Sequence, residues 1–306
     1  MQIGLLGLGR MGANMARRLA RAGVRVQVWN RSFEVAGQLA AEQPGIEAHA
    51  SVAHLVAALP APRVVWLMLP AGAPTEGVMQ ELSRALSPGD VVVNGANAWF
   101  KDSQRHAAEL AGQGFRFVDA GVSGGIWGLE NGYALMLGGN DDAVAMVAPF
   151  ARLLAPAPDR GWLHCGPVGS GHYVKMVHNG IEYGMMQALA EGFSLMRAKT
   201  EFGLDLAAIS EMWRHGSVVR SWLLDLMAEF LHHDQSLESI EPFVADSGEG
   251  RWTALDAIEQ GVPTPVMSLS LMMRFASQGR NEYSDKLLAM MRKGFGGHAV
   301  KGDDHE

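Results

Sequence analysis

The chain has 306 residues, a formal net charge of −7 and a single cysteine, Cys165. This length predicts two domains, each large enough to bury a hydrophobic core. The acidic balance argues against nucleic acid as the main partner, and one cysteine excludes an intrachain disulfide and fits a reducing, cytoplasmic compartment.

Membrane insertion and export are not predicted either. The first residues lead directly into a strand pattern, without the charged and apolar regions of a signal peptide. No uncharged apolar run approaches the length of about 18 residues that a spanning helix needs. His232 and His233 are adjacent and so point to different sides of a helix, which gives no chelating pair, and we expect no metal there.

A dinucleotide-binding pattern opens the chain. Residues 2–6 predict a buried strand, residues 7–12 read GLGRMG, and a helix is expected from about Arg10 to Ala22. Between a strand and a helix, the first glycine of GxGxxG makes a tight turn, the second lets a pyrophosphate approach, and the third lets helix and strand pack closely. A turn without a ligand is the alternative. The predicted cofactor contacts are Gly7, Leu8, Gly9, Arg10, Met11 and Gly12.

The end of the second strand, expected over residues 24–29, bears on the choice of cofactor. Asn30, Arg31 and Ser32 follow it, where a site specific for NAD usually offers an acidic side chain to the ribose. Arg31 and Ser32 instead suit the 2′-phosphate of NADP. An exposed arginine at a strand end is the alternative, so NADP is favoured and NAD stays open.

Strands and helices continue to alternate through the first half. Such alternation predicts a mainly parallel sheet with helices on both faces, whose ligands lie beyond the carboxyl ends of the strands. The expected helices cover residues 33–42, 75–86 and 103–113, and the expected strands residues 63–68, 90–93 and 115–119. Three loops are expected at the carboxyl edge, over residues 69–72, 94–97 and 120–125.

Two of these loops carry candidate contacts. Leu69 in the first loop is assigned to the cofactor site. Ser123, Gly124 and Gly125 offer a hydroxyl and unobstructed N–H groups, which suit a carboxylate or hydroxyl groups. A flexible turn is an equal alternative.

A long apolar helix in the middle of the chain carries one polar stripe. Lys175 and Glu182 lie two turns apart on nearly the same side, with His178 and Asn179 between them and Tyr183 beside them. A solvated face is the alternative, but charged residues are sparse along this helix. Burial moves the pKa of lysine and glutamate side chains toward neutrality, which suits proton transfer.

The second half of the chain reads as helical. After a proline-containing connection and a last short strand, the expected helices cover residues 171–196, 204–215, 220–231, 251–260, 263–277 and 284–292. We therefore expect an α/β Rossmann-like domain over residues 1–168 and an all-α substrate and oligomerisation domain over residues 169–306.

These features together resemble the decarboxylating 6-phosphogluconate dehydrogenases of the β-hydroxyacid dehydrogenase superfamily. The resemblance covers nearly the whole chain and is carried by GLGRMG, by Asn97, by GVSGG at residues 121–125 and by KMVHNGIEYG at residues 175–184. Superfamily relatives that act on 3-hydroxyisobutyrate or imines share the GLGxMG opening but are not expected to have HNGIEYG. The length is similar to that of the short form of the family, with one copy of the helical domain.

The resemblance implies a reaction of the pentose phosphate pathway, which converts 6-phospho-D-gluconate to ribulose 5-phosphate and carbon dioxide while a nicotinamide cofactor is reduced. Lys175 matches the base that takes the proton from the C3 hydroxyl, and Glu182 matches the acid that protonates the enediol left by decarboxylation. Implied contacts to the substrate carboxylate and hydroxyls are Asn97, Ser123, Gly124, Gly125, His178 and Asn179, with Asn97 also near the cofactor. Implied contacts to the phosphate are Tyr183 and Arg274, together with Arg292 and His298 in the tail of a neighbouring subunit.

Some positions depart from the family pattern. Residues 94–98 read NGANA where the family has DGGNS, and residues 247–252 read SGEGRW where it has KGTGKW, so a phosphate-binding lysine is missing unless Arg251 replaces it. Residues 292–298 read RKGFGGH and are similar to the family's C-terminal arginine and FGxH, so the resemblance implies a homo-oligomer, a dimer or tetramer, in which tails complete neighbouring active sites. A frayed terminus is the alternative. A non-decarboxylating 3-hydroxyacid dehydrogenase and a nucleotide-binding regulator are the alternative functions.

Overall fold

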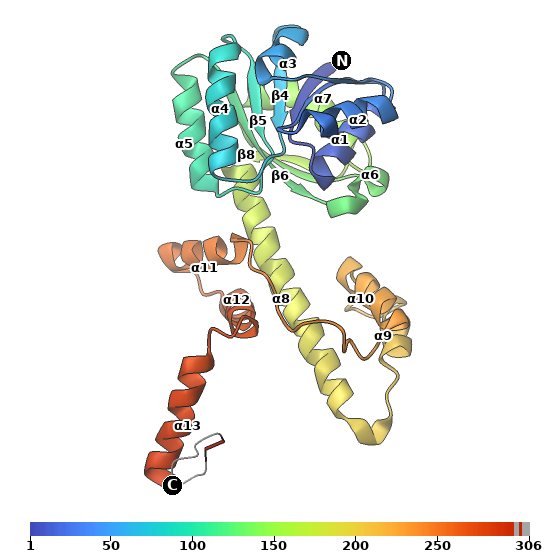
Figure 1. Cartoon of the computed structure of the whole chain (residues 1–306), viewed down its shortest axis with the longest axis vertical. Helices are drawn as coiled ribbons and strands as arrows, with labels where there is room; N and C mark the ends of the chain where they lie inside the picture. Colours follow the sequence, from blue (N-terminus) through green and yellow to red (C-terminus); the bar gives the residue numbers. More distant parts are fainter. Residues whose placement is uncertain (297–299, 302–306) are drawn as a thin grey trace. The chain divides into compact units, whose positions relative to one another are not determined.

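The computed structural model describes residues 1–296, 300 and 301, and for residues 295 and 296 only the backbone. The chain forms two compact units, Met1–Val177 and His178–Glu306 (Figure 1). The division falls within one continuous helix, α8 (Ser170–Ala198). None of the described helices has the length and apolar character needed to cross a membrane.

The first unit is built on a twisted sheet with the strand order β3-β2-β1-β4-β5-β6-β7-β8. Neighbouring strands are parallel except for the antiparallel pair β6 and β7. The order of the first six strands is that of a doubly wound dinucleotide-binding fold. The strands are β1 (Gln2–Leu6), β2 (Arg25–Trp29), β3 (Ile46–Ala48), β4 (Val64–Leu67), β5 (Val91–Asn94), β6 (Arg116–Ser123), β7 (Ala134–Gly139) and β8 (Trp162–Gly166).

Helices cover both faces of this sheet, and each face has its own hydrophobic core. Alternate residues of β5 show why: Val91 and Val93 belong to one core and Val92 to the other. A strand buried on both faces needs a continuous apolar run, which is the pattern of this segment. The helices are α1 (Arg10–Arg21), α2 (Phe33–Glu42), α3 (Val52–Ala58), α4 (Ala73–Ala85), α5 (Phe100–Ala111), α6 (Gly128–Asn131) and α7 (Asp141–Leu154).

The predicted Rossmann-like sheet and the helical second part are confirmed, but the sheet extends further than the sequence pattern indicates. Strand β6 does not end at Asp119; it continues to Ser123, because Ala120–Ser123 pair with β7. Several short elements were not predicted, among them β3, α3, α6 and β7. The loop expected over residues 120–125 is therefore mostly strand.

The second unit is helical, with a small core formed by Phe193, Leu206, Leu224 and Leu231. Gly180 lets α11 pack closely, since a Cβ there would lie 2.8 Å from Cγ2 of Thr253. Its helices after α8 are α9 (Leu206–Arg214), α10 (Trp222–His233), α11 (Glu249–Gln260), α12 (Pro265–Ser277) and α13 (Glu282–Gly296).

Helix α13 corrects one expectation about the end of the chain. Arg292 was expected at the start of a glycine-rich tail, but it lies within α13, which continues to Gly296. One glycine inside a helix costs only about 1 kcal/mol, so Gly294 does not end the helix. His298 lies outside the described residues.

Candidate active site

The glycine-rich turn between β1 and α1 forms one wall of a pocket. Gly7 has a φ of 94°, and a Cβ there would lie 2.5 Å from the carbonyl oxygen of Met68. A Cβ on Gly12 would overlap the carbonyl oxygen of Gly7. Backbone conformation and packing therefore require these two glycines. Gly9 is different, because its φ is −63° and no atom lies within 4 Å of the position that a Cβ would take.

The open space beside Gly9 indicates a ligand. Gly9 precedes α1 and has no side chain to cap the first N–H groups of that helix. These donors and the positive end of the helix dipole are suited to phosphate oxygens, and a glycine lets a pyrophosphate come close to the backbone. The residues present therefore fit a dinucleotide, and the absence of a side chain at Gly9 is explained by that ligand.

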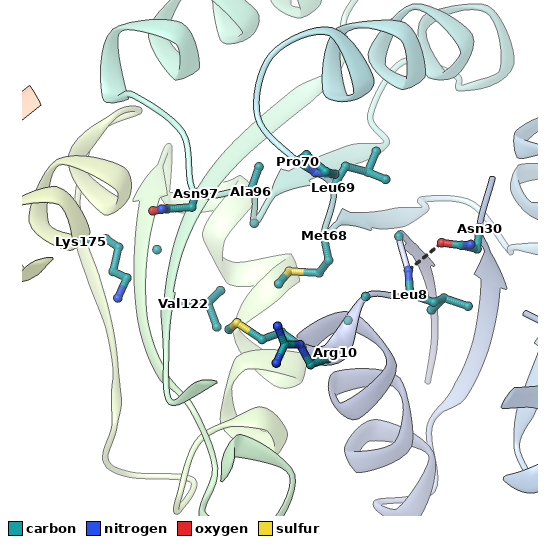
Figure 2. A pocket seen from close by; sticks show the side chains of 16 residues that line it. Leu8, Arg10, Asn30, Met68, Leu69, Pro70, Ala96, Asn97, Val122 and Lys175 are labelled. Atoms are coloured by element: carbon teal, nitrogen blue, oxygen red, sulfur yellow. Dashed lines mark hydrogen bonds between the residues drawn. The ribbon is translucent and has the colours of Figure 1, made fainter. Parts of the chain in front are cut away.

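The pocket has a volume of about 330 Å³ and lies beyond the carboxyl ends of β1, β4 and β5 and beside β6 (Figure 2). Figure 2 shows Leu8 and Asn30 at one end of it and Asn97 and Lys175 at the other. Its lining comprises Gly7, Leu8, Gly9, Arg10, Met11, Gly12, Asn30, Met68, Leu69, Pro70, Gly95, Ala96, Asn97, Gly121, Val122 and Lys175. The structure thus brings most of the predicted cofactor residues together with the predicted base.

The turn after β2 lies at the end of the pocket that Leu8 and Asn30 form (Figure 2). The backbone N–H of Leu8 donates to Oδ1 of Asn30 over 3.1 Å, and Nδ2 of Asn30 donates to the carbonyl oxygen of Ser32 over 3.2 Å. Asn30 therefore joins the glycine-rich turn to the end of β2. Arg31 and Ser32 are exposed and lie outside the pocket lining, at the same turn.

Lys175 reaches the pocket because α8 lies directly against β6. A Cβ on Gly121 would overlap the Cβ of Lys175 and would lie 2.8 Å from the carbonyl oxygen of Gly171. Only glycine at position 121 permits this approach. Lys175 is half-buried, and Asn97 is exposed on the loop after β5.

Ser123, Gly124 and Gly125 follow the lining residues Gly121 and Val122 but are not themselves part of the lining. Ser123 ends β6, and Gly124 and Gly125 have φ values of 131° and 55°. These positive values favour glycine whether or not a ligand binds, so the turn has a structural reason for its composition.

In the second unit, polar residues of α8 meet the start of α11. Nδ2 of Asn179 donates to Oε1 of Glu249 over 3.2 Å, and Oγ of Ser247 donates to Oε2 of Glu249 over 2.7 Å. The hydroxyl of Tyr183 lies 3.4 Å from Oγ of Ser247. The guanidinium of Arg274 lies 3.5 Å from the centroid of the Tyr183 ring. Asn179, Tyr183 and Arg274 therefore belong to one cluster, which also contains the buried carboxylate of Glu249.

His178 and Glu182 lie on the same helix, one turn apart. Nδ1 of His178 is 3.1 Å from Oδ1 of Asn179 and 3.8 Å from Oε2 of Glu182. The side chain of Glu182 is 40% exposed. Glu182 is therefore not buried as the sequence predicted, because other residues cover this face of α8 only in part.

Arg251 already has an acidic partner, so it is not an unpaired cation that could replace the missing phosphate-binding lysine. Its Nε pairs with the carboxylate of Asp246, and its guanidinium stacks 4.6 Å from the ring centroid of Phe275. Arg292 is exposed on α13.

Sequence reasoning missed several residues of both clusters. Pro70, Gly95 and Ala96 line the pocket and belong to loops that were predicted to face the ligand, so a signal for them existed. Glu249 had no comparable signal, because a glutamate at a helix start is commonly explained by the helix dipole.

The fold and the pocket together define a class of protein. A doubly wound dinucleotide domain, a pocket with an open glycine turn and a lysine from the helix that leads into a helical domain define a nicotinamide-dependent oxidoreductase of the β-hydroxyacid dehydrogenase superfamily.

Comparisons with known proteins narrow the class to one family. Residues 2–159 match the model of the NAD binding domain of 6-phosphogluconate dehydrogenase, and residues 171–299 match that of its C-terminal domain. The chain is 41% identical over 305 residues to an NAD(+)-dependent, decarboxylating 6-phosphogluconate dehydrogenase of Haloferax volcanii, covering 99% of this chain and 100% of that protein. The chain therefore belongs to the 6-phosphogluconate dehydrogenase family.

Longer relatives indicate that the chain is a short form. A decarboxylating 6-phosphogluconate dehydrogenase of Salmonella typhimurium is 36% identical over 287 residues, covering 90% of this chain but 61% of that protein. A solved structure of Plasmodium falciparum 6-phosphogluconate dehydrogenase matches with a TM-score of 0.84 and 28% identity, covering 100% of this chain and 67% of that one.

Proposed function

We propose that the protein oxidises and decarboxylates 6-phospho-D-gluconate, giving ribulose 5-phosphate and carbon dioxide, as a cytoplasmic enzyme of the pentose phosphate pathway. The observation that carries the proposal is the pocket in which Lys175 faces the dinucleotide turn. Two further observations support the same reaction. They are the motif KMVHNGIEYG at residues 175–184 and the name of the Haloferax volcanii relative, which matches over its whole length.

Lys175 and Glu182 would divide the proton transfers. A nicotinamide dinucleotide held by the glycine-rich turn at residues 7–12 would supply the acceptor for the hydride that leaves C3. Neutral Lys175 takes the proton of the C3 hydroxyl at Nζ and afterwards returns it to the C3 ketone oxygen, so that the electrons of the C1–C2 bond form an enediol as carbon dioxide leaves. Glu182 then donates a proton to the carbon that lost the carboxylate, which becomes C1 of ribulose 5-phosphate.

The remaining candidate residues would hold the substrate. We assign the carboxylate and hydroxyl groups to Asn97, Ser123, Gly124, Gly125, His178 and Asn179. Tyr183 and Arg274 would contact the phosphate, since Arg274 already stacks on the Tyr183 ring.

A dianionic phosphate needs more than one cationic side chain, and Arg251 is paired with Asp246. We therefore propose that Arg292 and His298 of a neighbouring subunit complete the site in a dimer or tetramer. Exposed apolar side chains on α12, Val266 and Leu269, support association of subunits.

For the cofactor we propose NADP, with NAD as the alternative. Arg31 and Ser32 at the end of β2 support NADP because no acidic side chain stands there. The Haloferax volcanii relative is named as NAD(+)-dependent, and NADP+ is named as the cofactor of the Plasmodium falciparum enzyme.

The proposal is tested by incubating the protein with 6-phosphogluconate or gluconate, each with NADP or NAD, while cofactor reduction and carbon dioxide release are measured. With 6-phosphogluconate we expect both cofactor reduction and carbon dioxide release. Lys175→Met should turn over more slowly than the wild type, by about 10²-fold or more, and should still bind the dinucleotide. Reduction without carbon dioxide would favour a 3-hydroxyacid dehydrogenase. Dinucleotide binding without any turnover would favour a nucleotide-binding regulator.

The assembly is tested by mixing two inactive variants, Lys175→Met and Arg292→Ala, after dissociation of their subunits. If tails act in trans, hybrid oligomers contain sites with an intact Lys175 and an intact Arg292, and activity returns in part. Demonstrably mixed oligomers without activity would show that the tail does not complete a neighbouring site.

A further inference from the structure

The first turn of α8 lies directly on the backbones of β6 and β7. A Cβ on Gly171 would lie 2.6 Å from the carbonyl oxygen of Asp119 and 2.8 Å from the backbone nitrogen of Gly138. A Cβ on Gly138 would in turn lie 2.6 Å from the backbone nitrogen of Gly171. With Gly121 against Lys175, these contacts leave α8 little room to slide on the sheet.

A carboxylate from β6 caps this helix. Asp119 is fully buried, and its two oxygens accept hydrogen bonds from the backbone N–H of Gly169 over 2.6 Å and of His172 over 2.7 Å. Gly169 directly precedes α8 and His172 lies in its first turn, where backbone N–H groups have no partner within the helix. Burial raises the pKa of Asp119 to about 6, so the group is ionised at neutral pH. Asp119 thus attaches α8 to β6 at both N–H groups.

A second buried contact attaches α8 to the loop that carries Asn97. Oγ of Ser103 lies 2.6 Å from Nδ1 of His172, and both residues are almost fully buried. Ser103 stands in the first turn of α5, a few residues after Asn97. His172 precedes Lys175 by three residues, so the two lie on neighbouring positions of one helix face.

We propose that Asp119 and the Ser103–His172 pair are positioning residues that hold Lys175 against Asn97 and Gly121 in the pocket. The inference rests on the proposed role of Lys175 as general base. Two tethers of different origin, one to β6 and one to α5, meet within a single turn of the helix that carries the base. A general base requires such restraint, because displacement by about 1 Å costs about 10²-fold in rate.

The chain offers a matched control for a purely structural effect. Asp90 is also buried and accepts two backbone N–H groups, from Arg63 over 2.7 Å and from Ser87 over 2.9 Å, and it pairs in addition with Nη1 of Arg63 over 3.0 Å. It directly precedes β5, at the amino end of that strand, whereas the pocket residues Gly95, Ala96 and Asn97 follow the carboxyl end. Asp90→Asn therefore removes a buried carboxylate that also accepts two backbone N–H groups, together with its ion pair to Arg63, without touching the elements that carry Lys175.

The experiment compares Asp119→Asn with Asp90→Asn in the full-length protein. Measured quantities are kcat and KM for 6-phosphogluconate, NADP affinity, the thermal midpoint and amide hydrogen exchange. We expect kcat to fall about 10- to 100-fold in Asp119→Asn with NADP affinity unchanged, and the amides of Gly169 and His172 to exchange faster. Asp90→Asn should lose stability and keep its kcat.

The hydroxyl of Ser103 supplies a gentler test if Asp119→Asn does not fold. Ser103→Ala should lower kcat, and Ser103→Thr, which retains a hydroxyl, should restore it. Equal thermal destabilisation of Asp119→Asn and Asp90→Asn with wild-type kcat in both, or wild-type kcat in Ser103→Ala, would overturn the inference. A wild-type protein without turnover of 6-phosphogluconate would refute the proposed function instead, and amide exchange at His172 would still decide whether Asp119 caps α8.

Discussion

Replacing Gly121 with alanine should push α8 away from β6 at the position of Lys175. The new Cβ would overlap the Cβ of Lys175 and would lie 3.2 Å from its Cγ. Carbon atoms in ordinary contact are about 3.5–4.0 Å apart, so relief requires a shift of about 1 Å. The hydrogen bonds that Asp119 accepts from the backbone N–H groups of Gly169 and His172 oppose that shift.

The magnitude follows from this geometry. Insertion of a methyl group into a packed site costs about 1–3 kcal/mol of stability. Displacement of a reacting group by about 1 Å lowers a rate by about 10²-fold. We therefore expect Gly121→Ala to fold with reduced stability and to lose between about 10-fold and about 100-fold in kcat.

The assay measures turnover of 6-phosphogluconate, NADP binding and urea unfolding for Gly121→Ala beside Gly77→Ala. Gly77 lies on α4 and has no atom within 4 Å of the position that a Cβ would take. Alanine there should raise the free energy of unfolding by about 0.5–1 kcal/mol and leave kcat unchanged. A folded Gly121→Ala protein with wild-type kcat would refute the close contact between α8 and β6 or the need for a precisely placed Lys175.

Three further predictions address the acid, the cofactor and the buried histidine. Glu182→Gln should slow turnover by about 10²-fold or more, because protonation of the enediol is impaired after carbon dioxide has left. Unchanged turnover at saturating substrate would assign the acid to another residue. Arg31→Asp should raise the KM for NADP by about 10- to 100-fold more than that for NAD, and an equal effect on both would exclude a phosphate contact. Burial lowers the pKa of His172 from 6.5 to about 4, so the unfolded chain takes up a proton as pH falls below 6.5 and the folded chain does not. Stability is therefore lost with falling pH, and urea unfolding should show that the wild type loses about 1 kcal/mol more than His172→Gln between about pH 7 and about pH 5.5, whereas parallel losses would contradict a neutral buried imidazole.

The sequence was sufficient for most of the first unit because its signals are local. The strands of the Rossmann-like sheet are apolar runs, and GLGRMG lies between a strand and a helix. Strand β7 had no such signal, since its place depends on antiparallel pairing with Ala120–Ser123 of β6. Pairing between strands is a tertiary property, and propensity describes it poorly.

Site residues that belong to a known sequence motif could be predicted. Site residues that are brought together by contacts between distant parts of the chain could not. Lys175 and the glycine turn were identified by motif and meet in one pocket. The contacts of Asp119 with His172 and of Asn179 with Glu249 join residues 53 and 70 positions apart. No periodicity connects such pairs, so only the folded chain reveals them.

The open space at Gly9 has a consequence for engineering this protein. Since its φ of −63° is accessible to any residue and no neighbour occupies the Cβ position, alanine at position 9 should fold almost as well as glycine. A library screened for heat resistance would accept Gly9→Ala as neutral, although the methyl group stands where a pyrophosphate must approach. Selection for stability alone would therefore accumulate variants that are folded and stable but inactive. Dinucleotide affinity has to be screened at the same time.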